Sequence, residues 1–253
     1  MIKAAYDRYK VGVISDIHGN IEALNAVLAD GEKNGVNEWI CTGDLVNYGP
    51  RPSEVIDTVR RTISVCVIGN RDFEVVSGAT ESDIVIPGGR DPEVEKAAFR
   101  WTRERLGEEE RRYLESLPRF AVKMVGSVGI ALLHATPWSL YEYLPVSDIG
   151  YASQRLIEHT QAQVYCFGHT HVPYTVWQSG RVFVNAGSCG RPKDGDPRPC
   201  YVLITVSTDG PSNSFSVRSI EIVRVAYDVD STVRDMVRMA LPGPLSESLK
   251  RGA

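Results

Sequence analysis

The first 70 residues alternate strand-like and helix-like patterns. The run VGVIS at 11–15 is short, apolar and rich in β-branched residues, and residues 21–32 then place Leu24, Val27 and Leu28 at helical spacing. The pair recurs as a strand over 38–44 and a helix over 52–62, followed by a strand over 64–70. Alternation of this kind folds as parallel strands joined by right-handed crossovers. We therefore predict a βαβαβ unit built on a parallel sheet.

The rest of the chain predicts one domain over 1–253 with a second sheet. Residues 73–119 are polar with helical spacing, which indicates a helical insertion. A β-hairpin over 120–134, with Gly126 near its turn, and a helix over 148–159 precede several further strand-like runs. With few crossovers between them, these strands suggest a second sheet packed on the first. Residues 228–240 read as a short helix, and the tail over 241–253 is expected to be poorly ordered.

Composition narrows the class of protein. The chain has 253 residues, 43% hydrophobic and 24% charged, which suits one large core. No apolar run is long enough to span a bilayer and the first residues lack a signal peptide, so we expect a cytoplasmic protein without membrane contact. A net charge of −4 without a basic stripe makes nucleic acid an unfavoured partner. Five widely spaced cysteines are expected to be buried, reduced thiols.

Side chains that can bind metal follow each of the first three strands. Asp16 and His18 come two residues apart after the first strand, which places them on one side of an extended chain. Asp44 ends TGD after the second strand, and Asn70 ends IGN after the third. The separations of 28 and 26 residues are close to one strand-helix-strand repeat of about 30. Because ligands bind at the carboxyl ends of parallel strands, we expect these four side chains to meet.

The second half supplies imidazoles in the same way. His134 ends the strand-like run GIALLH, and His169 and His171 follow VYCF in GHTH. Four of the five histidines thus lie directly after predicted strands. The fifth, His159, is interpreted as an ordinary helical residue. Alone, each motif is compatible with a simple turn, but their order and spacing together favour a metal centre.

The ordered set of motifs resembles the calcineurin-like metallophosphoesterase superfamily. It consists of Asp16-x-His18, Gly43-Asp44, Gly69-Asn70, His134 and Gly168-His169-x-His171. More narrowly, SDIHGNIEAL, GDLVNYGPRPSEV and NAGSCGRPKDGDP are similar to its small bacterial and archaeal phosphodiesterase branch, over roughly residues 10–206. The resemblance implies a four-layer α/β/β/α sandwich of two mixed sheets flanked by helices.

By resemblance, the ligands divide into two sets. Asp16, His18 and His171 would hold one ion, Asn70, His134 and His169 the other, and Asp44 would bridge them. A ligand set of carboxylates and imidazoles without thiolates is typical of a site for two divalent metal ions. Mn²⁺ is our first expectation, with Fe, Zn²⁺ or Ni²⁺ as alternatives. Two ions about 3.5–4 Å apart can share a water and turn it into a hydroxide nucleophile aimed at phosphorus. They would also attract an anionic substrate to an acidic protein.

One position departs from the family pattern. A histidine follows the Asn ligand in much of the superfamily, but Arg71 stands there in this chain. Arginine cannot deliver a proton near neutral pH, although it can contact phosphate oxygens. We interpret Arg71 as a phosphate contact. The alternative is that it only pairs with Asp72 or another surface acid. Pocket roles for Asn20, Tyr48 and the loop NAGSCGRP are equally compatible with structural turns.

These features predict a two-metal phosphoesterase acting on a phosphodiester or a nucleotide anhydride. Its partner would be a phosphorylated small molecule or nucleotide, and nothing in the chain opposes a homo-oligomer. The first alternative is a phosphoprotein or phosphomonoester phosphatase, which can use the same ligands. A nuclease ranks lower. The second alternative is a scaffold that binds metal without catalysis.

Overall fold

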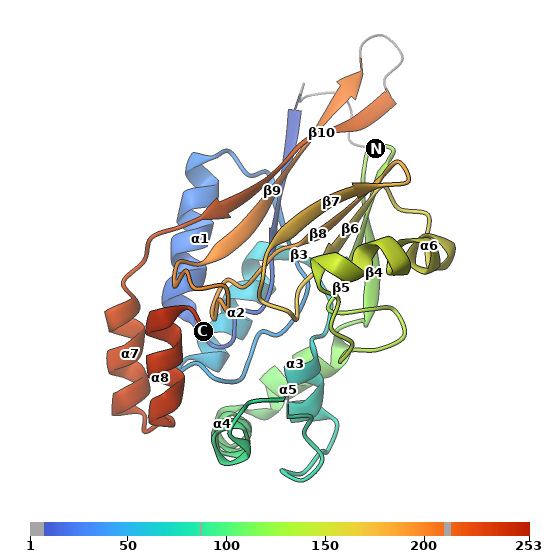
Figure 1. Cartoon of the computed structure of the whole chain (residues 1–253). Coiled ribbons are helices and arrows are strands. Elements are labelled where there is room, and N and C mark those ends of the chain that lie inside the picture. The colour runs from blue at the N-terminus through green and yellow to red at the C-terminus, as the bar shows by residue number, and fades with distance from the viewer. Residues whose placement is uncertain (1–7, 87, 210–213) are drawn as a thin grey trace.

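The chain folds into two packed five-stranded sheets with helices on their outer faces (Figure 1). The computed structural model describes residues 8–86, 88–209 and 214–253. Within them the strand orders are β10-β9-β1-β2-β3 and β4-β5-β6-β8-β7. Both sheets are mixed, and eight α-helices accompany them in these residues. The predicted four-layer α/β/β/α architecture is therefore confirmed.

The first sheet contains the predicted βαβαβ unit. Its parallel strands β1, β2 and β3 are joined by α1 and α2, and the bounds are β1 Arg8–Ile14, α1 Ile21–Lys33, β2 Glu38–Cys41, α2 Pro52–Thr62 and β3 Ile63–Cys66. Two late strands complete it, β9 Cys200–Asp209 antiparallel to β1 and β10 Ser214–Arg224 antiparallel to β9. The expectation that the later strands extend a second sheet is wrong for this pair, because β9 pairs with the free side of β1.

The second sheet has a parallel centre with an antiparallel strand at each edge. Its strands are β4 Phe120–Val125, β5 Val128–Leu133, β6 Val164–Phe167, β7 Tyr174–Gln178 and β8 Arg181–Asn185. Strands β5, β6 and β8 run parallel, whereas β4 pairs antiparallel with β5 and β7 with β8. The hairpin turn at Gly126 has φ 58°, as predicted for that turn. Strand β7 was not predicted.

Alternating side chains bind the layers together. On β1, Val11 and Val13 point into the core between the sheets, where they meet Ile130 and Leu132 of β5. Ile14 packs on the other side with α1 and α2. The outer face of the second sheet is covered by α6 (Ile149–His159), which follows a short 3₁₀ turn at Val146–Asp148. Strands buried on both faces explain the continuous apolar runs in the sequence.

The predicted helical insertion forms three helices below the sheets in Figure 1. They are α3 Asn70–Val76, α4 Pro92–Arg105 and α5 Glu108–Ser116. Helix α3 begins at Asn70 itself, so the third metal-binding motif is at a helix start. The insertion is thereby anchored directly beside the ends of the central strands.

The C-terminal tail is ordered, and the prediction of poor order over 241–253 is wrong. Helix α8 (Gly243–Arg251) follows α7 (Val229–Arg238), and the two lie together at the lower left of Figure 1. Leu245 and Leu249 are buried in a small core with Tyr48 and Trp101. Two leucines on one face are enough to stabilise this short helix, because they pack against an apolar surface of the same chain.

Two further expectations concern the whole chain. All five cysteines are buried free thiols, as predicted. Among the described residues, no helix combines the length and apolar character that crossing a membrane requires.

Candidate metal centre

The predicted ligands meet where the central strands of both sheets end. Asp16 and His18 follow β1, Asp44 follows β2, and Asn70 follows β3. His134 follows β5, and His169 and His171 follow β6. Backbone bonds tie these loops to one another, from Asp16 N to Gly43 O at 2.9 Å and from Gly168 N to His134 O at 3.0 Å. Strand ends of two sheets therefore supply a single site.

Five of the seven predicted ligands have strained backbone. Their positive φ angles lie between 49° and 65°, and the residues are Asp16, His18, Asp44, His169 and His171. A residue other than glycine in this left-handed region costs about 1–3 kcal/mol and persists where the surroundings demand it. Such strain gathers at functional sites.

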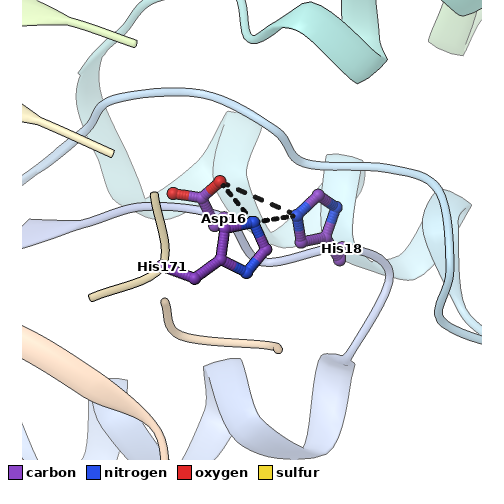
Figure 2. A group of neighbouring side chains, drawn as sticks. All are labelled: Asp16, His18 and His171. Atoms are coloured by element: carbon purple, nitrogen blue, oxygen red, sulfur yellow. Dashed lines mark hydrogen bonds and ion pairs between the residues drawn. The ribbon is translucent and has the colours of Figure 1, made fainter. Parts of the chain in front are cut away.

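The first cluster joins Asp16, His18 and His171 (Figure 2). The Nε2 atoms of the two imidazoles lie 3.2 Å apart, and Oδ1 of Asp16 lies 3.2 Å from His171 Nε2 and 3.7 Å from His18 Nε2. The other carboxylate oxygen, Oδ2, accepts from Ser15 Oγ and from the His169 backbone N–H. Oδ1 is buried and has no hydrogen-bond donor. One oxygen is thus fixed and the other is left for a cation.

The second cluster surrounds Asp44. Its Oδ2 lies 3.5 Å from His134 Nε2 and 3.7 Å from His18 Nε2, and its Oδ1 accepts from Arg71 N at 2.8 Å. Asn70 Oδ1 is 3.0 Å from His134 Nε2. Asp16, Asp44 and His134 form a second compact group of donor atoms. Asp44 therefore lies between the two clusters, where a bridging ligand would have to be.

The ring orientations test whether metal ions fit this site. Nδ1 of His18, His134 and His171 each meets a backbone carbonyl, of Val46, Thr42 and Arg191 respectively. A carbonyl only accepts, so each Nδ1 carries the proton and each Nε2 presents a lone pair to the centre. Two lone pairs facing each other at 3.2 Å repel unless a cation lies between them. A histidine that binds metal usually donates its other ring N–H to such a carbonyl, so the residues fit divalent ions.

His169 is placed differently. Its ring lies 5.1 Å from that of His134, but its Nε2 is 3.3 Å from the Tyr141 carbonyl, and it joins neither compact group. Burial, followed by the charge of His134, lowers the pKa of His169 to about 3. The imidazole is therefore neutral and able to bind metal near neutral pH. Its role as a ligand of the second ion stays a prediction.

The two buried aspartates have opposite pKa shifts. Burial raises the pKa of the Asp16 carboxyl, but the nearby imidazoles, above all His171, outweigh it and hold that pKa well below the usual range. Burial and the charge of Asp16 raise the pKa of Asp44 to about 7, against the opposing effect of His18. Two carboxylates this close repel unless cations separate them. The pKa shifts of Asp16 and Asp44 are those expected of a site that binds cations.

Glycines allow the strand ends to approach one another. A Cβ on Gly69 would lie 2.1 Å from Asp44 Oδ1, and one on Gly168 would lie 1.8 Å from Ser15 Oγ. Neither distance is compatible with a side chain at these positions. The glycines of GD, GN and GHTH therefore serve close packing around the aspartates rather than turn formation alone.

Arg71 lies beside the centre and is firmly held. Its side chain is 4% exposed, and it donates to Glu74 Oε2 at 2.7 Å and to Glu95 Oε2 at 3.1 Å. Asp72 is not its partner, because that carboxylate accepts from the backbone of Leu45, Val46 and Gly69. The structure therefore shows two buried ion pairs of Arg71. A contact between Arg71 and phosphate remains a prediction.

A cavity of about 400 Å³ opens over the centre. The insertion contributes Val85, Gly88 and Arg90 to its wall, and Arg71, Tyr48, Tyr141, Tyr143 and Lys193 also line it, together with His18, Asp44, Asn70, His169 and His171. Burial raises the pKa of Tyr141 to about 12, so its phenol stays protonated and can donate. The cavity joins candidate metal ligands to hydrogen-bond donors, as an anion site requires.

Several residues with open roles are structural. Asn20 caps α1 by accepting from Ala23 N and donates to the Gly190 carbonyl. In the loop NAGSCGRP, Asn185 donates to Gly168 O and Ser188 Oγ donates to Asp16 O. These bonds hold the ligand loops in place. His159, at the end of α6, packs on Phe120 and belongs neither to the two donor groups nor to the cavity lining.

The cavity also contains cations that the motifs did not indicate. Arg90 comes from the loop before α4, and Lys193 comes from the loop after β8. Neither residue follows a strand directly. Lys193 lies within the motif NAGSCGRPKDGDP but was not a predicted site residue, and Arg90 lies outside the quoted motifs; only the fold brings the two to the cavity.

The fold and this cluster of buried carboxylates and imidazoles are those of a metallophosphoesterase. The family comparison agrees: residues 9–209 match the model of the calcineurin-like phosphoesterase superfamily domain, and the chain belongs to that superfamily. Members of this family are metal-dependent hydrolases of phosphoesters. The resemblance found in the motifs is therefore confirmed.

Relatives extend the match over nearly the whole chain. An uncharacterized protein from Methanocaldococcus jannaschii is 30% identical over 262 residues, covering 96% of this chain and 98% of the relative. The structure of a metallophosphoesterase from Sphaerobacter thermophilus is 28% identical with a TM-score of 0.76, covering 97% and 100%. A hypothetical protein from Pyrococcus horikoshii shares the fold, with 22% identity and a TM-score of 0.79 over 97% and 99%.

Proposed function

We propose that the chain is a two-metal phosphoesterase that hydrolyses a phosphodiester or a nucleotide anhydride. The observation that carries the proposal is the set of three imidazoles whose Nδ1 atoms bind backbone carbonyls while their Nε2 atoms converge on Asp16 and Asp44. Asp16, His18 and His171 would hold one ion, and Asn70, His134 and His169 the other, with Asp44 between them.

The chemistry follows from the residues around the cavity. Divalent ions held there would supply a water of lowered pKa as nucleophile and would neutralise phosphate oxygens. The protein's part is to position the phosphate. At the cavity wall Tyr141 offers an O–H donor and Arg71 offers N–H donors for this purpose. Arg71 cannot protonate a leaving oxygen, so leaving groups that depart as stable anions are favoured. Aryl diesters and anhydrides are such substrates.

The donor set favours hard or borderline ions. Nitrogen and oxygen atoms surround the centre, and the five thiols are absent from both donor groups. We propose Mn²⁺ first, with Fe, Zn²⁺ or Ni²⁺ as alternatives. A cytoplasmic location, a nucleotide-like substrate and assembly into a homo-oligomer stay predictions.

Removal of metal tests the proposal. We expect chelation to abolish hydrolysis of bis(p-nitrophenyl) phosphate and added Mn²⁺ to restore it. Because ions bind the folded state, Mn²⁺ at a thousand times its dissociation constant should stabilise the protein by about 4 kcal/mol. For a chain of this size that raises Tm by roughly 8–16 °C. Metal analysis, calorimetry and the colorimetric assay measure the three effects. A protein that takes up metal and gains stability but hydrolyses no phosphoester would instead be a scaffold.

Replacement of Arg71 tests the leaving-group argument. We expect Arg71→His to make hydrolysis of aryl diesters less dependent on the pKa of the leaving phenol, because histidine can donate a proton. Loss of the ion pairs to Glu74 and Glu95 should cost about 3–5 kcal/mol of stability, so assays belong well below the variant's Tm. Rates across a series of phenols give the dependence. Arg100→His, at an exposed ion pair with Glu81, is the control. An unchanged slope in a folded Arg71→His protein would remove the argument.

A further inference from the structure

Besides Arg71, the wall of the cavity carries two cations that belong to neither ligand cluster. They are Lys193 and Arg90, called the cationic side below, and they line the cavity together with His18, His169 and His171. Lys193 is half-buried, and within residues 8–86, 88–209 and 214–253 its ammonium has no hydrogen bond or ion pair. The partial loss of water around this ammonium is therefore not offset by a carboxylate.

Arg191 is a second cation without a carboxylate partner, and it lies against Tyr48 rather than on the cavity wall. Its side chain is 5% exposed, its guanidinium lies 4.0 Å over the ring of Tyr48, and its Nη1 is buried without a hydrogen-bond partner. Burial and the charge of Arg90 lower the pKa of Arg191 to about 10, which leaves it charged at neutral pH. The guanidinium of Arg71 lies 5.4 Å from the same ring, so one tyrosine contacts both arginines.

The carboxylates near these cations are already occupied. Glu95 accepts from Tyr48, Arg71 and Arg90, and Glu74 accepts from Arg71 and the Val85 N–H. Arg71 and Arg90 are therefore paired with these two carboxylates, whereas Lys193 and Arg191 have no carboxylate partner within the residues that the structure describes. With metal ions balancing Asp16 and Asp44, the single negative charge of a phosphodiester would leave at least one of these two cations without a counter-charge.

We propose that Lys193 and Arg90 form a subsite for a second phosphate group of the substrate, beside the phosphate attacked at the metal centre. The inference rests on the proposed function and specifies its substrate class, an organic phosphate with at least two phosphate groups, such as a nucleotide. Lys193 supplies a mobile point charge, and Arg90 supplies guanidinium donors not used by Glu95. Arg191 and Arg71 strengthen the field from behind.

The surroundings of Lys193 agree with this role. Burial, followed by the charges of Arg90 and Arg191, lowers the pKa of Lys193 well below its ordinary value. A phosphate between Lys193 and Arg90 would oppose that shift, so the anion and the protonated lysine stabilise each other. Tyr143, 46% exposed and 4.7 Å from the ring of His169, lies on the same cavity wall and offers a face for a planar group.

A matched pair of substrates tests the subsite. Thymidine 5′-(p-nitrophenyl phosphate) and its 3′-phosphate derivative share the attacked phosphorus and the nitrophenolate leaving group, and differ only in the second phosphate. We expect the wild-type protein with Mn²⁺ to prefer the derivative. In Lys193→Gln the ratio of the two kcat/KM values should fall by about 10- to 100-fold, the usual worth of a charge-assisted hydrogen bond. Lys193→Arg should recover most of the preference.

Controls separate this inference from the proposed function. Lys33→Gln, at the exposed end of α1, should leave the ratio at its wild-type value. Calorimetry with thymidine 3′,5′-bisphosphate and thymidine 5′-monophosphate gives a readout without turnover: the wild type should bind the bisphosphate more tightly, and Lys193→Gln should lose that difference. If the protein hydrolysed neither ester, the proposed function would be overturned. The binding measurements would still decide whether the subsite exists. Equal losses on both esters, or no preference in either assay, would overturn the subsite.

Discussion

Asp44→Asn should lower kcat/KM for bis(p-nitrophenyl) phosphate by about 10³-fold, at the upper end of what a single electrostatic group at a reacting centre contributes. Asp44 Oδ2 lies between His18 Nε2 and His134 Nε2, at 3.7 and 3.5 Å. Asparagine keeps the shape and the bond from Arg71 N to the side-chain oxygen, but it removes the charge between the two clusters. We therefore expect metal content to fall from two ions per chain to one or none.

The same substitution should not destabilise the metal-free protein. Burial and Asp16 raise the pKa of Asp44 to about 7, so the folded state holds its proton more tightly than the unfolded chain does. Stability from that proton is present at low pH and is lost as pH rises from the unfolded value toward 7. Above pH 7, wild-type apo-protein carries an unfavourable buried charge that Asp44→Asn lacks. Its apo Tm at pH 8 should be equal to or above that of the wild type.

Metal analysis, kinetics and thermal unfolding of one preparation distinguish these effects. Asp57→Asn, on the exposed face of α2, is the matched control and should retain metal and activity. A lower apo Tm with reduced activity would mean that Asp44 acts by holding the fold. Two bound ions with wild-type kcat/KM would remove Asp44 from the proposed centre.

The approach of the ligands was predictable because strand ends obey a simple rule. Asp16, Asp44 and Asn70 each follow a parallel strand, and the carboxyl ends of such strands meet at one edge. The imidazoles follow the parallel strands of the second sheet for the same reason. What spacing could not supply was the orientation of each ring. That depends on carbonyls such as Thr42 O, contributed by a different strand end.

The cationic side of the cavity was beyond prediction for a physical reason. Lys193 and Arg90 lie more than 100 residues apart, in loops whose paths depend on packing rather than on a repeating pattern. Arg71 was noticed because it replaces a family histidine, yet its partner Glu95 comes from α4. Long-range ion pairs leave no periodic signal in a sequence.

The C-terminal tail shows how a local pattern can mislead. Two prolines and two glycines in LPGPLSESLKRGA favour an irregular end, but Pro242 and Gly243 lie at the start of α8, where proline and glycine are tolerated. Leu245 and Leu249 then bury against the core around Tyr48 and Trp101. The tail therefore supports the wall of the site. Only tertiary contact reveals that a nine-residue helix is stable there.

Gly190 is the point where the loop after β8 touches the first ligand loop. Its N–H donates to Asp16 O at 2.9 Å, and its carbonyl accepts from Asn20 Nδ2 at 2.9 Å. A Cβ at this position would lie 1.7 Å from the Ile17 carbonyl oxygen. Ile17 stands between Asp16 and His18, so its backbone cannot retreat without moving both ligands. The absence of a side chain at Gly190 is therefore a condition for the geometry of the first cluster.

Gly190→Ala should consequently impair both stability and metal binding. Overpacking of a rigid contact costs about 1–3 kcal/mol, which corresponds to a fall in Tm of roughly 2–12 °C for a chain of this size. Displacement of Asp16 and His18 should weaken metal binding by about 10- to 100-fold, as loss of an outer support does elsewhere. Gly243→Ala is the control, because a Cβ there meets nothing within 4 Å. If Gly190→Ala lost stability while binding metal as tightly as the wild type, the loop after β8 would brace the fold without positioning the ligands.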